Sequence, residues 1–192
     1  MILTLPNILT LSRVAVIPVL VALFFLETAN GQWIACGIFI FSAITDFFDG
    51  FLARSLGQTT AFGTFLDPVA DKLLVASALL MMVAFGQIAG VVVIPAIIIL
   101  CREILVSGLR EYLSGFAVSL PVSNLAKWKT TLQMAAICIL IVGDAAHPLI
   151  PDLIPVRLIG EVGLWVAAIV TIITGSEYLR IGLRHMDQKN TS

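Results

Sequence analysis

The sequence has few charges, and no excess of one sign. Only 12% of its 192 residues are charged and 59% are hydrophobic, whereas an ordinary soluble domain carries about 25% charged residues. The net charge is −1, so no positive field attracts nucleic acid, and we expect no nucleic-acid partner. A water-soluble fold could not hide this much apolar surface. The composition therefore predicts an integral membrane protein.

Cysteine and histidine are also scarce. The three cysteines, Cys36, Cys101 and Cys138, lie singly within apolar runs, and the chain has only two histidines. No C-x-x-C pair or Cys/His cluster is present, which argues against a zinc site and a disulfide framework. We expect all three thiols to pack in the core.

Long apolar runs predict six transmembrane helices. A span needs about 20 mostly apolar residues. Polar or Gly/Pro clusters separate six such segments, at about 8–27, 32–54, 66–87, 89–112, 125–146 and 155–182. No linker is long enough to separate two domains. We therefore expect residues 1–192 to form a single all-α transmembrane domain, with the six helices in one bundle.

The distribution of positive charge predicts the orientation. With six spans, both termini lie on the same side of the membrane. Ten of the 11 lysines and arginines fall on that side, and only Arg157 falls on the other. The positive-inside rule then places both termini in the cytoplasm and predicts a multi-pass protein of the inner (cytoplasmic) membrane. Some of these cations can serve topology alone.

Four aspartates stand where the second and third segments meet the cytoplasm. Asp46 and Asp49 are three residues apart and Asp67 and Asp71 are four apart, so each pair shares one helix face. Each charge costs about 2.5–3.5 kcal/mol at the centre of a membrane helix, so a bound cation would relieve the site. All-oxygen ligands suit Mg²⁺ or Mn²⁺, and carboxylates on two helices could hold two such ions.

The neighbouring residues suit a phosphate-containing substrate. Gly50 and Ala53 reduce bulk on the carboxylate face. Arg54 can pair with a phosphate through two N–H groups, and Thr59 and Thr60 offer hydroxyls. Magnesium often completes its coordination shell with phosphate oxygens. The motif thus predicts a site for metal and phosphate together, facing the cytoplasm.

Simpler interpretations exist for single residues. Asp67 before Pro68 can cap a helix that starts there. Arg54 can extend to the membrane surface, and Lys72 can neutralise Asp71 locally. None of these explains four carboxylates that face one another.

The pattern D-x2-D-G-x2-A-R-x8-G-x3-D-x3-D, from Asp46 to Asp71, resembles the signature of the CDP-alcohol phosphotransferase family at all eight fixed positions. The resemblance implies a homodimeric, six-helix membrane protein that depends on Mg²⁺ or Mn²⁺. It implies that Asp46, Asp49 and Asp67 bind metal, and that Asp71 both contacts metal and acts as the base. It also implies that the CDP moiety is contacted by Gly50, Ala53 and Arg54.

Three further segments narrow the resemblance within the family. They are 5–13, 102–111 and 127–131, and they resemble the members that use sn-glycerol 3-phosphate as acceptor. The implied reaction transfers a phosphatidyl group from CDP-diacylglycerol to sn-glycerol 3-phosphate and releases CMP. With this reading, the CDP-lipid site also includes Asn7, Thr10 and Thr60.

A cluster of cations is expected to bind the acceptor. Arg102 and Arg110 are eight residues apart, about two helical turns, so they lie near one stripe. Lys127 and Lys129 open the fifth segment from the same side of the membrane. Together the four could hold the phosphate of glycerol 3-phosphate. The alternative is that they serve topology and internal ion pairs with neighbouring glutamates.

Other functions stay open. Within the family, the acceptor could be phosphatidylglycerol, which would give cardiolipin, or another alcohol. Outside it, intramembrane carboxylates could mark a cation or proton carrier. Carriers often contain inverted repeats and midplane sites. This chain shows no evident repeat, and its aspartates gather at one membrane face.

Overall fold

The computed structural model describes residues 4–55, 60–114, 124–146 and 155–190 and is helical over almost all of them. Within these ranges some side chains fall outside the description, at 5–6, 47–55, 61, 64, 114, 124 and 184–190. The described part contains six α-helices and two short 3-10 helices. The α-helices are α1 (Leu5–Phe24), α2 (Ala29–Ser55), α3 (Ala61–Ala84), α4 (Val93–Ser114), α5 (Asn124–Val142) and α6 (Val156–Asn190), and the 3-10 helices are η1 (Gly90–Val92) and η2 (Gly143–Ala146).

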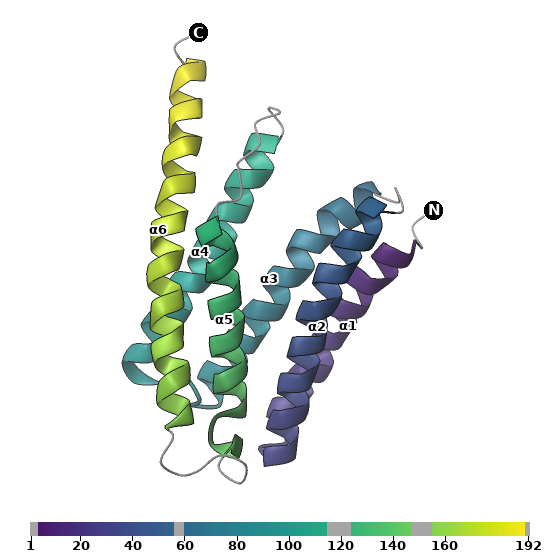
Figure 1. Ribbon diagram of the computed structural model, residues 1–192, viewed down its shortest axis with the longest axis vertical. Coiled ribbons are helices and arrows are strands. Elements are labelled where there is room, and N and C mark those ends of the chain that lie inside the picture. Colours follow the sequence, from purple (N-terminus) through teal and green to yellow (C-terminus); the bar gives the residue numbers. More distant parts are fainter. Residues whose placement is uncertain (1–3, 56–59, 115–123, 147–154, 191–192) are drawn as a thin grey trace.

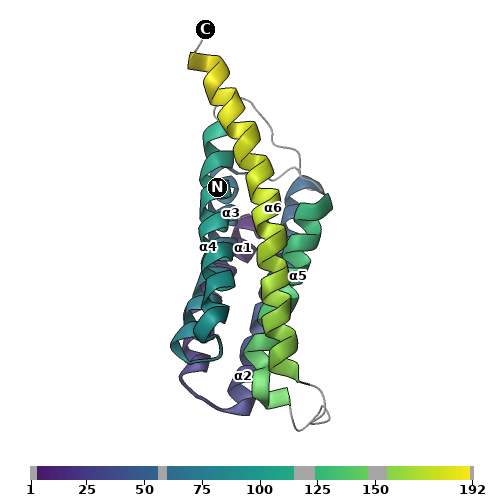
Figure 2. The same cartoon turned by 90° about the vertical axis from the view of Figure 1, so that its left-hand side faces the viewer.

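The helices run alternately up and down one bundle (Figure 1). α1 packs against α2 and α3, and α6 packs against α4 and α5. Figure 2 shows α6 lying between α4 and α5. The two three-helix groups meet mainly along α2–α5 and α3–α4. Both chain ends and the junction of α2 with α3 lie at the same end of the bundle (Figure 1).

Apolar side chains cover the outside of the bundle as well as its core. Leu20, Phe39 and Leu74 are buried, whereas Phe41 and Ile97 are exposed on the outer surface. Four described segments are long and apolar enough to cross a membrane: Asn7–Phe24, Gly90–Leu113, Leu125–Ala146 and Val156–Leu183. A helix that is apolar on all sides needs lipid around it. The chain is therefore a multi-pass membrane protein.

Small residues let α6 approach its neighbours closely. A Cβ atom on Gly182 would lie 2.7 Å from Leu109 Cδ1 of α4. One on Gly160 would lie 2.7 Å from Leu140 Cγ of α5. Membrane helices associate largely through such close packing, because lipid removes the hydrophobic drive between them.

The structure excludes one of the simpler interpretations and corrects one expectation. The third helix begins at Ala61, and the Thr60 hydroxyl caps it by accepting the Gly63 N–H at 3.0 Å. Asp67 and Pro68 therefore lie inside α3, and Asp67 is not its cap. Cys101 is exposed on α4, so of the three thiols only Cys36 and Cys138 pack against the core.

Candidate functional site

The aspartates of the motif lie at the end of the bundle where α2 ends and α3 begins. Asp46 and Asp49 belong to the last three turns of α2, and Asp67 and Asp71 to the first three turns of α3. The side chains of Asp46, Asp67 and Asp71 are all half-buried. The side chain of Asp49 lies outside the described residues, as do those of Gly50, Ala53 and Arg54.

Three polar residues of α1 reach this site. Asn7, Thr10 and Arg13 are each at most 1% exposed, although α1 is mostly apolar. The Thr10 hydroxyl donates to Asp67 Oδ1, and Arg13 Nη1 forms an ion pair with Asp46 Oδ1. The α1 stripe, as we name these three residues, thus contacts both helices that carry the aspartates.

The start of α3 is fixed to α1 by a third contact. The Thr60 hydroxyl donates to Asn7 Oδ1 at 2.9 Å. Gly63 packs closely against this hydrogen bond: a Cβ atom added to Gly63 would lie 2.5 Å from Asn7 Oδ1. The glycine of the motif therefore allows α1 and α3 to touch.

A cavity of about 680 Å³ opens between α2 and α5. Its walls are mostly apolar and include Phe39, Ile44 and Met134. Asp46 and Asp71 also line it, and along α2 and α3 they belong to the end that carries the motif. The cavity therefore joins a charged end to an apolar groove.

The donor set at this end suits a hard divalent cation. Carboxylate oxygens are the ligands that Mg²⁺ and Mn²⁺ prefer. A carboxylate can accept hydrogen bonds on both oxygens, so the contacts of Asp46 and Asp67 with α1 leave the second oxygen of each available. Among the side chains that the structure describes, no three His, Cys, Asp or Glu gather into one metal-sized cluster, and Asp49 is not among those side chains.

A second polar cluster joins α4, α5 and α6 at the same end. Lys129 of α5 is buried and forms an ion pair with Glu103 Oε1 of α4. Arg102 Nη1 lies 3.8 Å from Glu103 Oε2. Arg102 Nη2 also donates to the Thr174 hydroxyl of α6 at 3.2 Å. These contacts fix the relative positions of the three helices, as the ion-pair alternative suggested for Arg102 and Lys129.

Tyr178 of α6 holds the two arginines of α4. The Arg110 guanidinium lies 5.0 Å from the centre of the Tyr178 ring and donates from Nη2 to the Tyr178 hydroxyl at 3.1 Å. The Arg102 guanidinium lies 5.7 Å from the same ring. Cation–π contacts of this kind orient a guanidinium and leave N–H groups free to donate elsewhere.

The predicted acceptor residues are only partly brought together. Arg102 and Arg110 line one cavity of about 300 Å³, with Lys72 and Glu103. Lys129 lines a neighbouring cavity of about 40 Å³, together with Asp71 and Glu103. Lys127 lines neither of these and is exposed.

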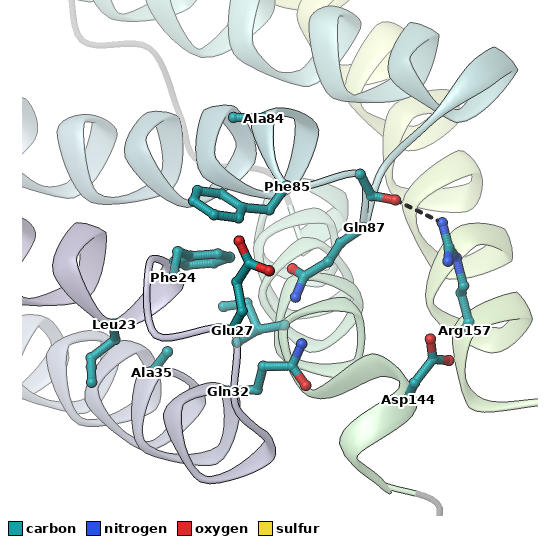
Figure 3. Close-up of a pocket in the computed structure, with 12 residues that line it drawn as sticks. Leu23, Phe24, Glu27, Gln32, Ala35, Ala84, Phe85, Gln87, Asp144 and Arg157 are labelled. Carbon is teal, nitrogen blue, oxygen red and sulfur yellow. Dashed lines mark hydrogen bonds between the residues drawn. The ribbon is translucent and has the colours of Figure 1, made fainter.

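The far end of the bundle holds a polar cavity of about 510 Å³, shown in Figure 3. Arg157 donates to the Gly86 carbonyl at 2.9 Å and pairs with Glu161 at 3.3 Å, which ties α6 to the turn after α3. Because this cavity lies where α1 and α3 end, it is separate from the aspartates. Its polar lining residues are Glu27, Gln32, Gln87, Asp144 and Arg157.

The sequence did not predict that Arg13 and Tyr178 belong to these clusters, whereas Glu103 was expected as a partner in the ion-pair alternative. One signal was present for Arg13, because polar residues at positions 7, 10 and 13 recur every three residues in an apolar helix. No comparable signal exists for Tyr178, which is far from Arg102 and Arg110 in the sequence.

Comparison with known proteins gives consistent matches. Residues 3–173 match the sequence profile described as CDP-alcohol phosphatidyltransferase. A Rickettsia bellii protein is 46% identical over 176 residues, covering 92% of this chain and 93% of that protein. A Cereibacter sphaeroides protein is 37% identical over 218 residues, covering 97% and 99%. A Wigglesworthia glossinidia brevipalpis protein is 37% identical over 186 residues, covering 96% and 97%. All three are named CDP-diacylglycerol–glycerol-3-phosphate 3-phosphatidyltransferase.

Proposed function

We propose that this chain, which belongs to the CDP-alcohol phosphatidyltransferase family, transfers the phosphatidyl group of CDP-diacylglycerol to sn-glycerol 3-phosphate. The products are phosphatidylglycerophosphate and CMP. The observation that carries the proposal is the agreement of full-length relatives at 37–46% identity, all named for this reaction. The aspartate motif at one end of the bundle provides the matching chemistry.

All six α-helices cross the membrane in this proposal, with both termini in the cytoplasm. The position of both chain ends at the aspartate end of the bundle supports it (Figure 1). The excess of Lys and Arg on that side supports a cytoplasmic location, and so the inner membrane. The active site then faces the cytoplasm, where CMP and glycerol 3-phosphate are soluble. A homodimer is part of the proposal, on the family resemblance alone.

Asp46, Asp49, Asp67 and Asp71 would hold Mg²⁺ or Mn²⁺, as two ions. When bound, the metal supplies positive charge that polarises the diphosphate and stabilises the CMP leaving group. The CDP-lipid would contact Asn7, Thr10, Gly50, Ala53, Arg54 and Thr60. Of these, Asn7, Thr10 and Thr60 are described at the aspartate end of α1 and α3.

The acyl chains would lie in the groove between α2 and α5. Its apolar walls, including Phe39 and Met134, match acyl chains, and Asp46 and Asp71 line it toward the motif. A lipid held there keeps its tails in the bilayer while its diphosphate reaches the carboxylates. The structure thus supports entry of the donor from the membrane.

The acceptor phosphate would bind the cations of α4 and α5, which are Arg102, Arg110, Lys127 and Lys129. The cavity that Arg102 and Arg110 share gives the best support. Tyr178 orients both guanidinium groups, and each keeps N–H donors for a phosphate. Lys129 supports this cavity through Glu103, and Lys127 extends the positive surface.

In the chemical step, a hydroxyl oxygen of glycerol 3-phosphate attacks the lipid-side phosphorus of CDP-diacylglycerol. Asp71 accepts the proton of that hydroxyl as the new P–O bond forms. The bond between this phosphorus and the bridging oxygen breaks, and CMP leaves with the electron pair. Asp71 lines the groove proposed for the lipid and also the small cavity that Lys129 and Glu103 line, and this position supports its role.

The deciding experiment incubates purified protein with CDP-diacylglycerol, Mg²⁺ and each of three acceptors: glycerol 3-phosphate, phosphatidylglycerol and inositol phosphate. We expect CMP release with glycerol 3-phosphate, loss of activity in EDTA, and inactive Asp46→Asn, Asp49→Asn and Asp67→Asn variants. A preference for phosphatidylglycerol would make the protein a cardiolipin synthase. No CMP with any acceptor, combined with cation flux in vesicles, would favour the carrier.

A further inference from the structure

The α1 stripe stands out because its residues are buried polar groups in an apolar helix. Asn7, Thr10 and Arg13 are three residues apart and lie on one face of α1. Placing an arginine within a membrane helix is costly unless it has a partner. Each residue of the stripe contacts a residue of the motif or of the α3 cap: Thr60, Asp67 or Asp46.

Thr10 can fix the orientation of Asp67. Its hydroxyl donates to Asp67 Oδ1, which restrains rotation of the carboxylate and leaves Oδ2 for another partner. The O–H group is donated to Asp67 here, so Thr10 does not donate it to the nucleotide. The direct effect of Thr10 is therefore on the orientation of the Asp67 carboxylate.

Arg13 can do the same for Asp46. Its side chain is fully buried, while that of Asp46 is 42% exposed, so the pair is reached by solvent from the Asp46 side only. Asp46 is thus held by α1 through Oδ1, and it also lines the cavity together with Asp71. The planar guanidinium gives this contact a direction that an ammonium group would not give.

We propose that Thr10 and Arg13 are positioning residues that hold one oxygen each of Asp67 and Asp46, so that the other oxygens are aimed at the metal. This inference rests on the metal site of the proposed function. Carboxylates that bind metal are commonly held by such outer contacts, whose loss weakens metal binding about 10–100-fold. Helix α1 is then part of the metal site although it carries none of the motif.

Mn²⁺ binding tests the inference without turnover. Full-length protein in detergent micelles with CDP-diacylglycerol and no acceptor is titrated with Mn²⁺. Free Mn²⁺ is followed by its electron paramagnetic resonance signal, and protein-free micelles are subtracted. The variants are Thr10→Val, which keeps the shape and removes the hydroxyl, and Thr10→Ser, which restores it. Ser12→Ala is the matched control, because Ser12 is exposed on the same helix and its hydroxyl donates to the Leu9 carbonyl of α1 at 2.7 Å.

We expect the Kd for Mn²⁺ to rise about 10–100-fold in Thr10→Val and to stay within about 3-fold of wild type in Thr10→Ser and Ser12→Ala. Arg13→Lys keeps the charge but loses the planar fork. If direction matters, it too weakens Mn²⁺ binding about 10-fold, whereas a role through charge alone would leave the Kd unchanged. Arg13→Lys decides the question by itself if Thr10→Val does not yield folded protein.

The outcomes separate this inference from the function on which it rests. If the wild type binds Mn²⁺ and both Thr10→Val and Arg13→Lys bind it equally well, the positioning role is wrong. The proposed metal site would be unaffected by that result. Equal losses in Thr10→Val and Thr10→Ser would also overturn it, because the hydroxyl would not be the cause. Absence of protein-dependent Mn²⁺ binding in the wild type would remove the metal site and the positioning role together.

Discussion

Replacing one member of the buried ion pair between Glu103 and Lys129 by a neutral residue should destabilise the bundle strongly. The Lys129 side chain is 5% exposed and that of Glu103 is 16% exposed. Glu103→Gln would leave the Lys129 ammonium buried without its counter-charge, and Arg102, 3.8 Å from Glu103, would lose the same partner. Removing one member of a buried pair costs about 3–5 kcal/mol. For a chain of this length that corresponds to a fall in Tm of about 6–20 °C.

The double variant gives the sharper result. Lys129→Met alone leaves the Glu103 carboxylate with Arg102, at 3.8 Å, as its remaining counter-charge, and so should destabilise by less than Glu103→Gln. Lys129→Met combined with Glu103→Gln removes both charges of the pair. Arg102 still lacks Glu103, but no ammonium is left buried without its partner, so the double variant should be more stable than Glu103→Gln alone. The matched control is Glu161→Gln, because Arg157 and Glu161 form an exposed i,i+4 pair at 3.3 Å. Its loss should cost about 0.5 kcal/mol or less.

Thermal unfolding in detergent measures the stability of the wild type, the two single variants, the double variant and the Glu161→Gln control. If the losses of the two single variants simply add in the double variant, Glu103 and Lys129 are not an energetic unit and the reasoning is wrong. Kinetics on the same proteins then test the acceptor role. If Lys129 contacts glycerol 3-phosphate directly, the double variant recovers stability but keeps a raised KM for that substrate.

Three further predictions follow from the site. Gly63→Ala places a Cβ atom 2.5 Å from Asn7 Oδ1, so it should break the Asn7–Thr60 bond and raise the KM for CDP-diacylglycerol; Gly37→Ala, which has open space around it, is the control and should change nothing. An unchanged KM in Gly63→Ala would place the nucleotide elsewhere. Arg110→Ala should raise the KM for glycerol 3-phosphate by about 10- to 150-fold, the equivalent of about 1.5–3 kcal/mol, and affect that for CDP-diacylglycerol much less. Equal effects on both substrates would instead indicate a structural role through Tyr178. Asp71→Asn should lower kcat by about 10²–10⁴ while CDP-diacylglycerol binding stays within a few-fold, as measured by single-turnover CMP release. Rescue of the rate by saturating Mn²⁺ would contradict its assignment as the base.

The helices and the aspartate motif could be read from the sequence because both are local properties. Six α-helices follow the six apolar runs, and their boundaries shift by only a few residues except at the start of α3 and the end of α6. The pairs of aspartates share a face because the α-helical period puts residues three and four apart together. The family assignment, confirmed by the matching relatives, came from the same spacing.

The side-chain partners were decided only by the tertiary structure. The contacts of Arg13 with Asp46, of Tyr178 with Arg110 and of Lys129 with Glu103 join helices that are far apart in the chain. Each depends on how far a helix is rotated and shifted against its neighbour, which hydropathy does not encode because lipid-facing and core positions are both apolar. The start of α3 depended on the Thr60 cap, a hydrogen bond that the apolar pattern does not contain. The sequence thus predicted which residues carry the chemistry, and the packing of α1 and α6 decided which groups contact them.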